Sequence, residues 1–71
     1  MRLFFKLPSG LTMEYPDVID EKEMLNYFTN YVEDLIGTNK IKYTCNNCIL
    51  DDKKTLFDLK IKSYDTICIN V

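Results

Sequence analysis

The chain has 71 residues, enough for one small domain and too few for a second, so residues 1–71 are treated as a single domain. An apolar content of 46% favours a folded chain over a disordered one, and no run is long enough to cross a membrane. The net charge of −2 does not by itself indicate a nucleic acid or a membrane as partner. Lys6 follows the N-terminal apolar run too closely for a signal peptide, which predicts a cytoplasmic or nuclear location, or both.

The first part of the chain has the pattern of a β-hairpin. Residues 1–7 alternate between apolar and other side chains, as a half-buried strand does. Gly10, at the end of the following turn, suits the left-handed position of a three-residue hairpin loop. Residues 11–15 alternate again and predict the return strand, which Pro16 ends because proline cannot donate to a ladder.

The next segment predicts one amphipathic helix over about residues 21–36. Asp20 and Glu23 have the spacing of a capping box, and Ile19 and Met24 have that of a hydrophobic staple. Gly37 tolerates the positive φ of a helix C-terminal cap. Seven apolar side chains fall within an arc of roughly 140°: Met24, Leu25, Phe28, Tyr31, Val32, Leu35 and Ile36.

The second half of the chain predicts three more strands. Residues 40–45 alternate, an Asn46-Asn47 turn follows, and residues 48–50 return. After a polar loop in which Asp51 and Asp52 act as turn formers, Thr55 caps a short 3-10 turn at about residues 56–59. Residues 64–71 form the last strand. The prediction is an α+β fold in which one helix lies across a mixed five-stranded sheet, in the order ββαββ, 3-10 turn, β.

Charge is distributed unevenly along this order. Residues 14–37 carry seven acidic side chains against Lys22 alone, a net charge of −6, while the segments before and after them each carry +2. With the helix on one face of the sheet, the helix side is acidic and the strands are mildly basic. Two interpretations follow: two solvated surfaces that maintain solubility, or a basic side that meets an acidic or mixed protein partner.

The element order and specific residues resemble the ubiquitin-like (β-grasp) family. The C-terminal third reproduces the family's spacing without a gap at Leu50-Asp51-Asp52, Thr55-Leu56, Asp58, Ile61 and Thr66-Ile67. The first hairpin is similar at Met1, Phe4, Lys6, Gly10 and Thr12. The likeness spans the whole chain, with a shifted register around residues 16–25. Lys53 and Leu59 depart from the family at a glycine and a tyrosine, which leaves the local loop conformation open.

The resemblance implies a function only where the residues that carry out the family's function are present. Ubiquitin-like modifiers are conjugated through a tail that ends in two glycines, and this sequence stops at Val71, so we expect no conjugation of the chain as given. Of the lysines that build ubiquitin chains, Lys6 alone has a counterpart. The others align with Leu11, Tyr27, Thr29, Glu33, Cys48 and Ser63. A conjugatable modifier whose tail lies outside this sequence is the alternative.

The family's apolar recognition patch aligns with Pro8, Thr44 and Asn70, two of which are polar here. Apolar anchors dominate such contacts, so receptors of ubiquitin should bind this chain poorly. We expect the same sheet face to bind a different protein partner. The candidate residues on it are Lys6, Pro8, Lys42, Thr44, Cys48, Cys68 and Asn70.

Cys45 and Cys48 form a CxxC motif, for which three interpretations are open. They are incidental hairpin thiols, a regulatory or adventitious disulfide, or part of a metal site. A zinc site needs four ligands, whereas this chain offers Cys68 as a third and no histidine. A small redox or metal-binding protein is therefore a third hypothesis for function.

No group placed for acid–base or nucleophilic catalysis is visible, so the sequence predicts no enzyme, no catalytic residues, no cofactor and no metal. We expect a non-catalytic protein-interaction module that binds another protein and neither nucleic acid nor membrane. The polar sheet face gives no cause for self-association, which predicts a monomer or a domain of a larger protein.

Overall fold

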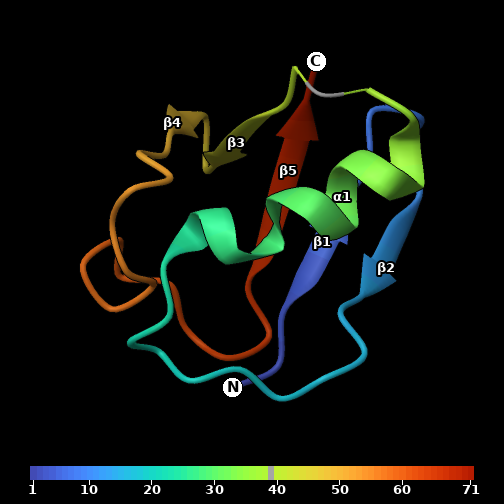
Figure 1. The fold of residues 1–71 in the computed structure, drawn as a ribbon. Coiled ribbons are helices and arrows are strands. Elements are labelled where there is room, and N and C mark those ends of the chain that lie inside the picture. The colour runs from blue at the N-terminus through green and yellow to red at the C-terminus, as the bar shows by residue number, and fades with distance from the viewer. Residues whose placement is uncertain (39) are drawn as a thin grey trace.

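A computed structural model describes residues 1–38 and 40–71 as one helical segment packed on a five-stranded sheet (Figure 1). The helical segment is a 3-10 helix, η1 (Leu25–Phe28), that continues directly into α1 (Thr29–Ile36). The strands are β1 (Phe4–Lys6), β2 (Thr12–Glu14), β3 (Lys42–Cys45), β4 (Cys48–Ile49) and β5 (Thr66–Asn70). The predicted α+β class, the five strands and the single helix are confirmed. Within the described residues, no helix combines the length and the apolar character needed to cross a bilayer.

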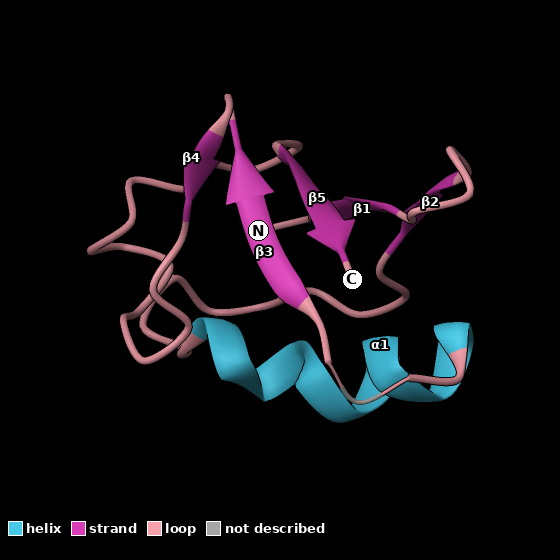
Figure 2. Cartoon of the chain, turned by 90° about the horizontal axis from the view of Figure 1, so that it is seen from above, coloured by secondary structure: helices cyan, strands magenta, loops and turns pink. Residues whose placement is uncertain are grey.

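The spatial order of the strands, β2-β1-β5-β3-β4, differs from their order along the chain. The last strand, β5, lies in the middle, parallel to β1 and antiparallel to β3. Both β1–β2 and β3–β4 are antiparallel hairpins, so the sheet is mixed. Seen from above, the helix lies on one side of the sheet, and the other side is not covered by any helix of the described chain (Figure 2). The sheet therefore has a helix-covered inner face and an outer face.

Both hairpin turns have the backbone geometry that the sequence predicts. Gly10 has φ +94°, and the turn closes through the Leu7 amide, which donates to the Leu11 carbonyl at 2.8 Å. Asn46 and Asn47 have φ values of 52° and 66°, the two consecutive positive values of a type I′ turn. Gly37 likewise ends α1 at φ 74°, where its amide donates to the Glu33 carbonyl.

The predicted start of the helix is wrong. The helical segment begins at Leu25, about four residues later than expected, and the capping residue Met24 is extended and provides no side-chain cap. The Asp20 side chain accepts a hydrogen bond from the Lys22 amide at 2.9 Å, and the Asp20 carbonyl accepts one from the Glu23 amide. Residues 20–23 therefore form a tight turn in place of the predicted capping box.

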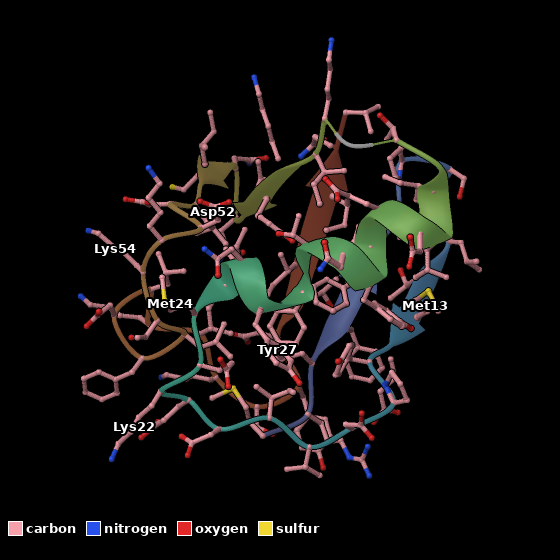
Figure 3. All side chains as sticks on the ribbon, in the orientation of Figure 1. Met13, Lys22, Met24, Tyr27, Asp52 and Lys54 are labelled. Atoms are coloured by element: carbon pink, nitrogen blue, oxygen red, sulfur yellow. The ribbon has the colours of Figure 1, made fainter. Side chains whose placement is uncertain are left out.

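A remote loop caps the helix instead. The Leu25 amide donates to the Lys54 carbonyl at 3.0 Å, and the Asn26 amide donates to the Asp52 carbonyl at 2.9 Å. Met24, Asp52 and Lys54 lie together at the beginning of the helical segment (Figure 3). These amides belong to the first helical turn and have no partner within it, so the loop satisfies groups that would otherwise be left exposed.

Hydrogen bonds also run the other way, from backbone amides of the loop to backbone carbonyls just before the helix. The Leu56 amide donates to the Glu23 carbonyl at 2.9 Å, and the Phe57 amide donates to the Glu21 carbonyl at 2.8 Å. Met24 and Thr55 form an isolated β-bridge between them. The backbone of residues 21–24 is held in this pairing, which explains why it does not enter the helix. We call the set of bonds between residues 21–26 and 51–57 the loop tether.

The predicted 3-10 turn at residues 56–59 is a single hydrogen-bonded turn that ends in a Schellman motif. The Thr55 hydroxyl accepts from the Asp58 amide at 3.1 Å, as the predicted cap requires. Lys60 has φ 60°, its amide donates to the Phe57 carbonyl, and the Ile61 amide donates to the Leu56 carbonyl. Leu56 and Ile61 are both buried, so this turn fixes one end of the core.

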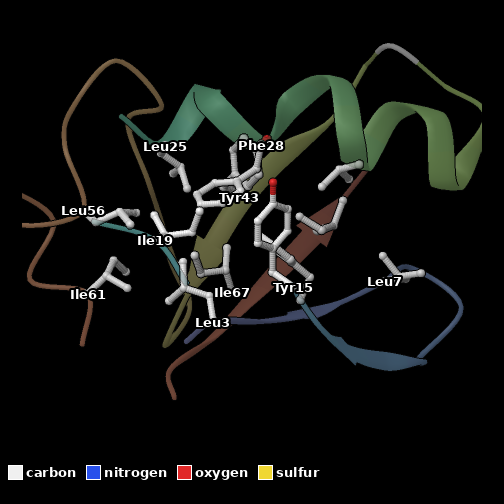
Figure 4. Packing of buried hydrophobic residues seen from close by; sticks show 13 residues of the cluster. Leu3, Leu7, Tyr15, Ile19, Leu25, Phe28, Tyr43, Leu56, Ile61 and Ile67 are labelled. Atoms are coloured by element: carbon white, nitrogen blue, oxygen red, sulfur yellow. The ribbon is translucent and has the colours of Figure 1, made fainter. Parts of the chain in front are cut away.

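The core lies between the helical segment and the inner face (Figure 4). Phe5, Tyr15 and Phe28 pack edge to face at its centre, with ring centroids 4.9–6.2 Å apart. Of the predicted apolar helix face, Leu25, Phe28 and Val32 are fully buried, whereas Met24 and Leu35 are 39% and 43% exposed. The buried residues are Leu3, Phe5, Leu7, Tyr15, Ile19, Leu25, Phe28, Val32, Tyr43, Leu56, Ile61, Ile67 and Ile69.

The two faces of the sheet can be distinguished by a matched pair of substitutions. Ile67 on β5 is 0% exposed and Ile49 on β4 is 76% exposed. We predict that Ile67→Val lowers the free energy of unfolding by about 0.5–1.5 kcal/mol, because a packed methyl group is lost. Ile49→Val should change it by less than about 0.5 kcal/mol. Urea unfolding measures both; equal losses would contradict the assignment of the faces.

The helix C-terminus provides a second test. A Cβ added at Gly37 would meet no atom within 4 Å, so the cost of a side chain there comes from its backbone angle alone. We predict that Gly37→Ala lowers the unfolding free energy by about 1–2 kcal/mol. Gly37→Asn should cost less, because asparagine tolerates the left-handed region better. A neutral Gly37→Ala variant in thermal or urea unfolding would show that the chain ends the helix in another conformation.

Tyr43 makes the free energy of unfolding depend on pH in the alkaline range. Burial raises the pKa of Tyr43, and the nearby carboxylates of Asp52 and Glu33 raise it further. The Tyr43 hydroxyl shares a hydrogen bond of 2.8 Å with the Thr29 hydroxyl, which lowers the pKa by less than burial raises it. The unfolded chain releases this proton near pH 10, where the folded protein still holds it. The unfolding free energy should therefore be intact below about pH 10 and fall as the pH rises towards the folded pKa.

We predict that Tyr43→Phe flattens this alkaline loss in urea unfolding measured from pH 8 to 11. Tyr64→Phe is the control, because the Tyr64 side chain is 69% exposed. Tyr15 also lowers the unfolding free energy at alkaline pH, equally in every variant, because burial raises its pKa too. Identical pH profiles for the Tyr43→Phe and Tyr64→Phe variants would contradict the prediction.

Candidate interaction surface

The outer face is built from alternate residues of each strand. In β5, Ile67 and Ile69 are buried against the core, whereas Thr66, Cys68 and Asn70 point the other way. The strand register aligns one residue from each strand into a row that crosses the whole sheet. In spatial order this central row is Thr12, Lys6, Cys68, Thr44 and Ile49.

The structure brings five of the seven predicted site residues together on this face. Lys6, Cys68 and Thr44 belong to the central row, and Lys42 pairs with Asn70 one step further along β3 and β5. Pro8 lies at the margin, in the first hairpin turn. It lines a separate hollow of 460 Å³ at the C-terminal end of α1. The other residues that line this hollow are Leu7, Ser9, Leu35, Ile36, Thr38 and Val71.

Cys48 does not lie on the outer face, which corrects the prediction. It pairs with Cys45 across the Asn46-Asn47 turn, and directly opposite residues in a sheet point to the same side. Cys45 follows Tyr43 by two residues and packs partly against the core, so both thiols are on the inner side. Cys48 is nevertheless exposed, because β4 is a two-residue edge strand.

Thr44 and Asn70, two polar residues of the outer face, bond to each other. The Asn70 side-chain amide donates to the Thr44 hydroxyl at 2.9 Å. They line one wall of a 460 Å³ hollow that also contains two exposed apolar side chains, Ile49 and Val71. Lys42 and Asn47 complete its lining. The hollow combines an apolar contact with hydrogen-bonding groups and one cation.

Ile49 and Val71 were not among the predicted site residues. The signal for Ile49 was present, because a two-residue turn at Asn46-Asn47 pairs residue 45 with 48 and residue 44 with 49. That register puts Ile49 beside Thr44 on the outer face. Val71 follows Asn70 directly and is 72% exposed.

The outer face carries unbalanced positive charge. Arg2 and Glu14 form the one ion pair among residues 1–38 and 40–71, at 3.5 Å between two exposed side chains. Lys6 and Lys42 are exposed, and neither has an ion-pair partner in the described part of the chain. On the opposite side, the final turns of α1 carry Glu33 and Asp34 and no basic residue.

The cysteines are free thiols in different settings. Cys45 is half-buried and its thiol donates a weak hydrogen bond to the Thr66 carbonyl at 3.7 Å. Burial raises the pKa of the Cys45 thiol, with further contributions from Asp65, Cys68 and Cys48. Among the described residues no three His, Cys, Asp or Glu side chains are grouped as a metal site requires.

The carboxylates that could suggest acid chemistry act as turn formers. Asp51 accepts from the Lys53 amide at 3.0 Å, and Asp65 accepts from the Lys62 amide at 2.8 Å. Asp52, the other member of the predicted pair, contributes its backbone carbonyl to the loop tether. Asp51 and Asp65 thus accept bonds from nearby backbone amides, whereas Asp52 takes part in a contact with a remote segment.

No protein-family model matches the chain, and no curated protein matches it either. The established description is therefore structural: an α+β fold in which one helical segment covers one face of a mixed five-stranded sheet.

Proposed function

We propose that the chain is a ubiquitin-like β-grasp domain that works as a non-catalytic protein-interaction module through its outer sheet face. The assignment of the fold family is supported by the residues quoted from the C-terminal third and by a mixed sheet with one helix across it. The pairing of the first hairpin with the last strand adds further support, because it brings the two most family-like segments together.

The observation that carries the functional proposal is the composition of the outer face. Lys6 and Lys42 present two positive charges without ion-pair partners in the described chain, and Lys42 lines the same hollow as exposed Ile49. Desolvated apolar side chains supply the affinity of protein interfaces, and charged groups around them supply specificity and a faster encounter. A protein segment with acidic side chains around an apolar anchor complements this surface.

The polar pair inside the face explains why the partner should differ from those of ubiquitin. Thr44 and Asn70 satisfy each other through their hydrogen bond, so they offer no apolar pocket in the middle of the sheet. The apolar contacts in the hollow that this pair lines come instead from exposed Ile49 and Val71. The double substitution Lys42→Glu with Thr44→Arg disrupts the charge, the Thr44–Asn70 bond and the hollow at once.

We predict that affinity capture with the tagged double variant loses at least about 2 kcal/mol of partner affinity, roughly 30-fold, relative to the wild type. The matched control is Lys22→Glu with Asn30→Arg. It makes the same charge changes at exposed residues outside the sheet. Thermal unfolding must show both variants folded.

The two variants lead to opposite conclusions. Loss of a defined partner by the Lys42/Thr44 variant but not by the Lys22/Asn30 variant supports the outer face. Capture of an identical set of proteins by the wild type and the Lys42/Thr44 variant would remove the outer face from consideration.

A further inference from the structure

Cys45 and Cys48 are placed for a bond that the proposed function does not use. They are direct cross-strand partners on either side of the Asn46-Asn47 turn. The Leu50 amide donates to the Tyr43 carbonyl at 2.9 Å, so residues 43 and 50 are a hydrogen-bonded pair. Pairs alternate along an antiparallel ladder, which makes 45 and 48 a pair of the same kind, with Cα atoms about 5.5 Å apart. Disulfides most often join Cα atoms about 5.5–6 Å apart.

The two thiols differ in exposure, and this difference determines which of them reacts first with an oxidant. Cys48 is exposed on the edge strand and accessible to a dissolved oxidant. Cys45 is half-buried, and burial raises the pKa of its thiol. Cys48 therefore meets an oxidant first, and Cys45 is the neighbouring thiol that can react with the product.

Cys68 is excluded from this pair by the sheet. It pairs with Thr44 and points to the outer face, whereas Cys45, one residue further along β3, points to the inner side. Reaching Cys45 or Cys48 would require the thiol of Cys68 to pass through the plane of the sheet. The structure thus sets one pair of cysteines apart from the third.

We propose that Cys45 and Cys48 form a reversible disulfide, with hydrogen peroxide as oxidant and a thiol such as glutathione as reductant. The Cys48 thiolate attacks one peroxide oxygen, the O–O bond breaks, and the other oxygen leaves as water after it gains a proton. The sulfur of Cys45 then attacks the sulfur of the Cys48 sulfenic acid, the S–O bond breaks, and a second water leaves with the Cys45 proton. Two thiols are oxidised and one peroxide is reduced to two waters. Two glutathione thiols reverse the bridge and become one glutathione disulfide.

The position of the proposed disulfide favours its reduction back to two thiols. The bridge closes a ring around Asn46 and Asn47 alone, and so short a loop removes little conformational freedom from the unfolded chain. A disulfide that is exposed at one sulfur is also accessible to an attacking thiol. The inference concerns these thiols alone and does not depend on which partner the outer face binds.

The test treats the full 71-residue chain with a small excess of hydrogen peroxide and counts free thiols over time. The wild type should fall from three thiols to one, and Cys68→Ser from two to none. Cys48→Ser, a change at an exposed position, should lose thiols at least about tenfold more slowly, because the accessible thiol that attacks the peroxide is gone. Glutathione should restore the thiols of the wild type.

Tryptic digestion locates the bridge. Cys45 and Cys48 share the peptide Tyr43–Lys53, so the proposed bond appears as the loss of two hydrogens within that one peptide. A bond to Cys68 would instead link it to Ser63–Val71. Such a link, a disulfide between two chains as the main product, or equal rates for Cys48→Ser and Cys68→Ser would overturn the proposal.

Discussion

The loop tether is the constraint on which the rest of the structure depends. The helical segment is only three turns long and has no side-chain cap at its start, and a helix of that length is marginal in isolation. Carbonyls of Asp52 and Lys54 satisfy its first amides from about 30 residues away in the chain, while Glu21 and Glu23 accept bonds in return. These bonds hold the helix start against the turn that carries Leu56 and Ile61, and so close one end of the core.

Placing the helix in this way gives the sheet two different faces. The inner face is filled by Phe5, Phe28 and the isoleucines of β5, with no buried side-chain N or O atom left unsatisfied among the described residues. The outer face has no helix on it and presents lysines, a self-bonded Thr44–Asn70 pair and an exposed isoleucine. The proposed interaction follows from this asymmetry, because a face that the chain does not cover is the one that remains for a partner.

Features encoded by local backbone chemistry could be predicted from the sequence. Gly10, Gly37 and the Asn46-Asn47 pair all adopt the positive φ angles expected of them, since few other residues tolerate that conformation. Period-two alternation located four of the five strands and the Asn46-Asn47 turn located β4, although the strands extend less far than expected. The candidate surface came from the resemblance to the family, and alternation explains why five of its residues share a face, because residues two apart in a strand point to the same side.

Features decided by remote parts of the chain could not be predicted in the same way. Asp20 and Glu23 have the spacing of a capping box, yet the Asp20 carboxylate bonds to Lys22 and the Glu23 carbonyl bonds to Leu56. The position of β5 between β1 and β3 likewise depends on pairing between distant segments. The side of the sheet on which Cys48 lies is instead set locally, because the two-residue turn places Cys48 opposite Cys45 and therefore on the inner side.

Amide hydrogen exchange at Leu25 and Asn26 tests the loop tether most directly. In an ordinary helix these first-turn amides have no partner and exchange quickly. Because they donate to Lys54 and Asp52 here, we predict that they exchange as slowly as the central amides of β5. Exchange of both at the rate of exposed loop amides, with β5 still protected, would show that the loop does not cap the helix.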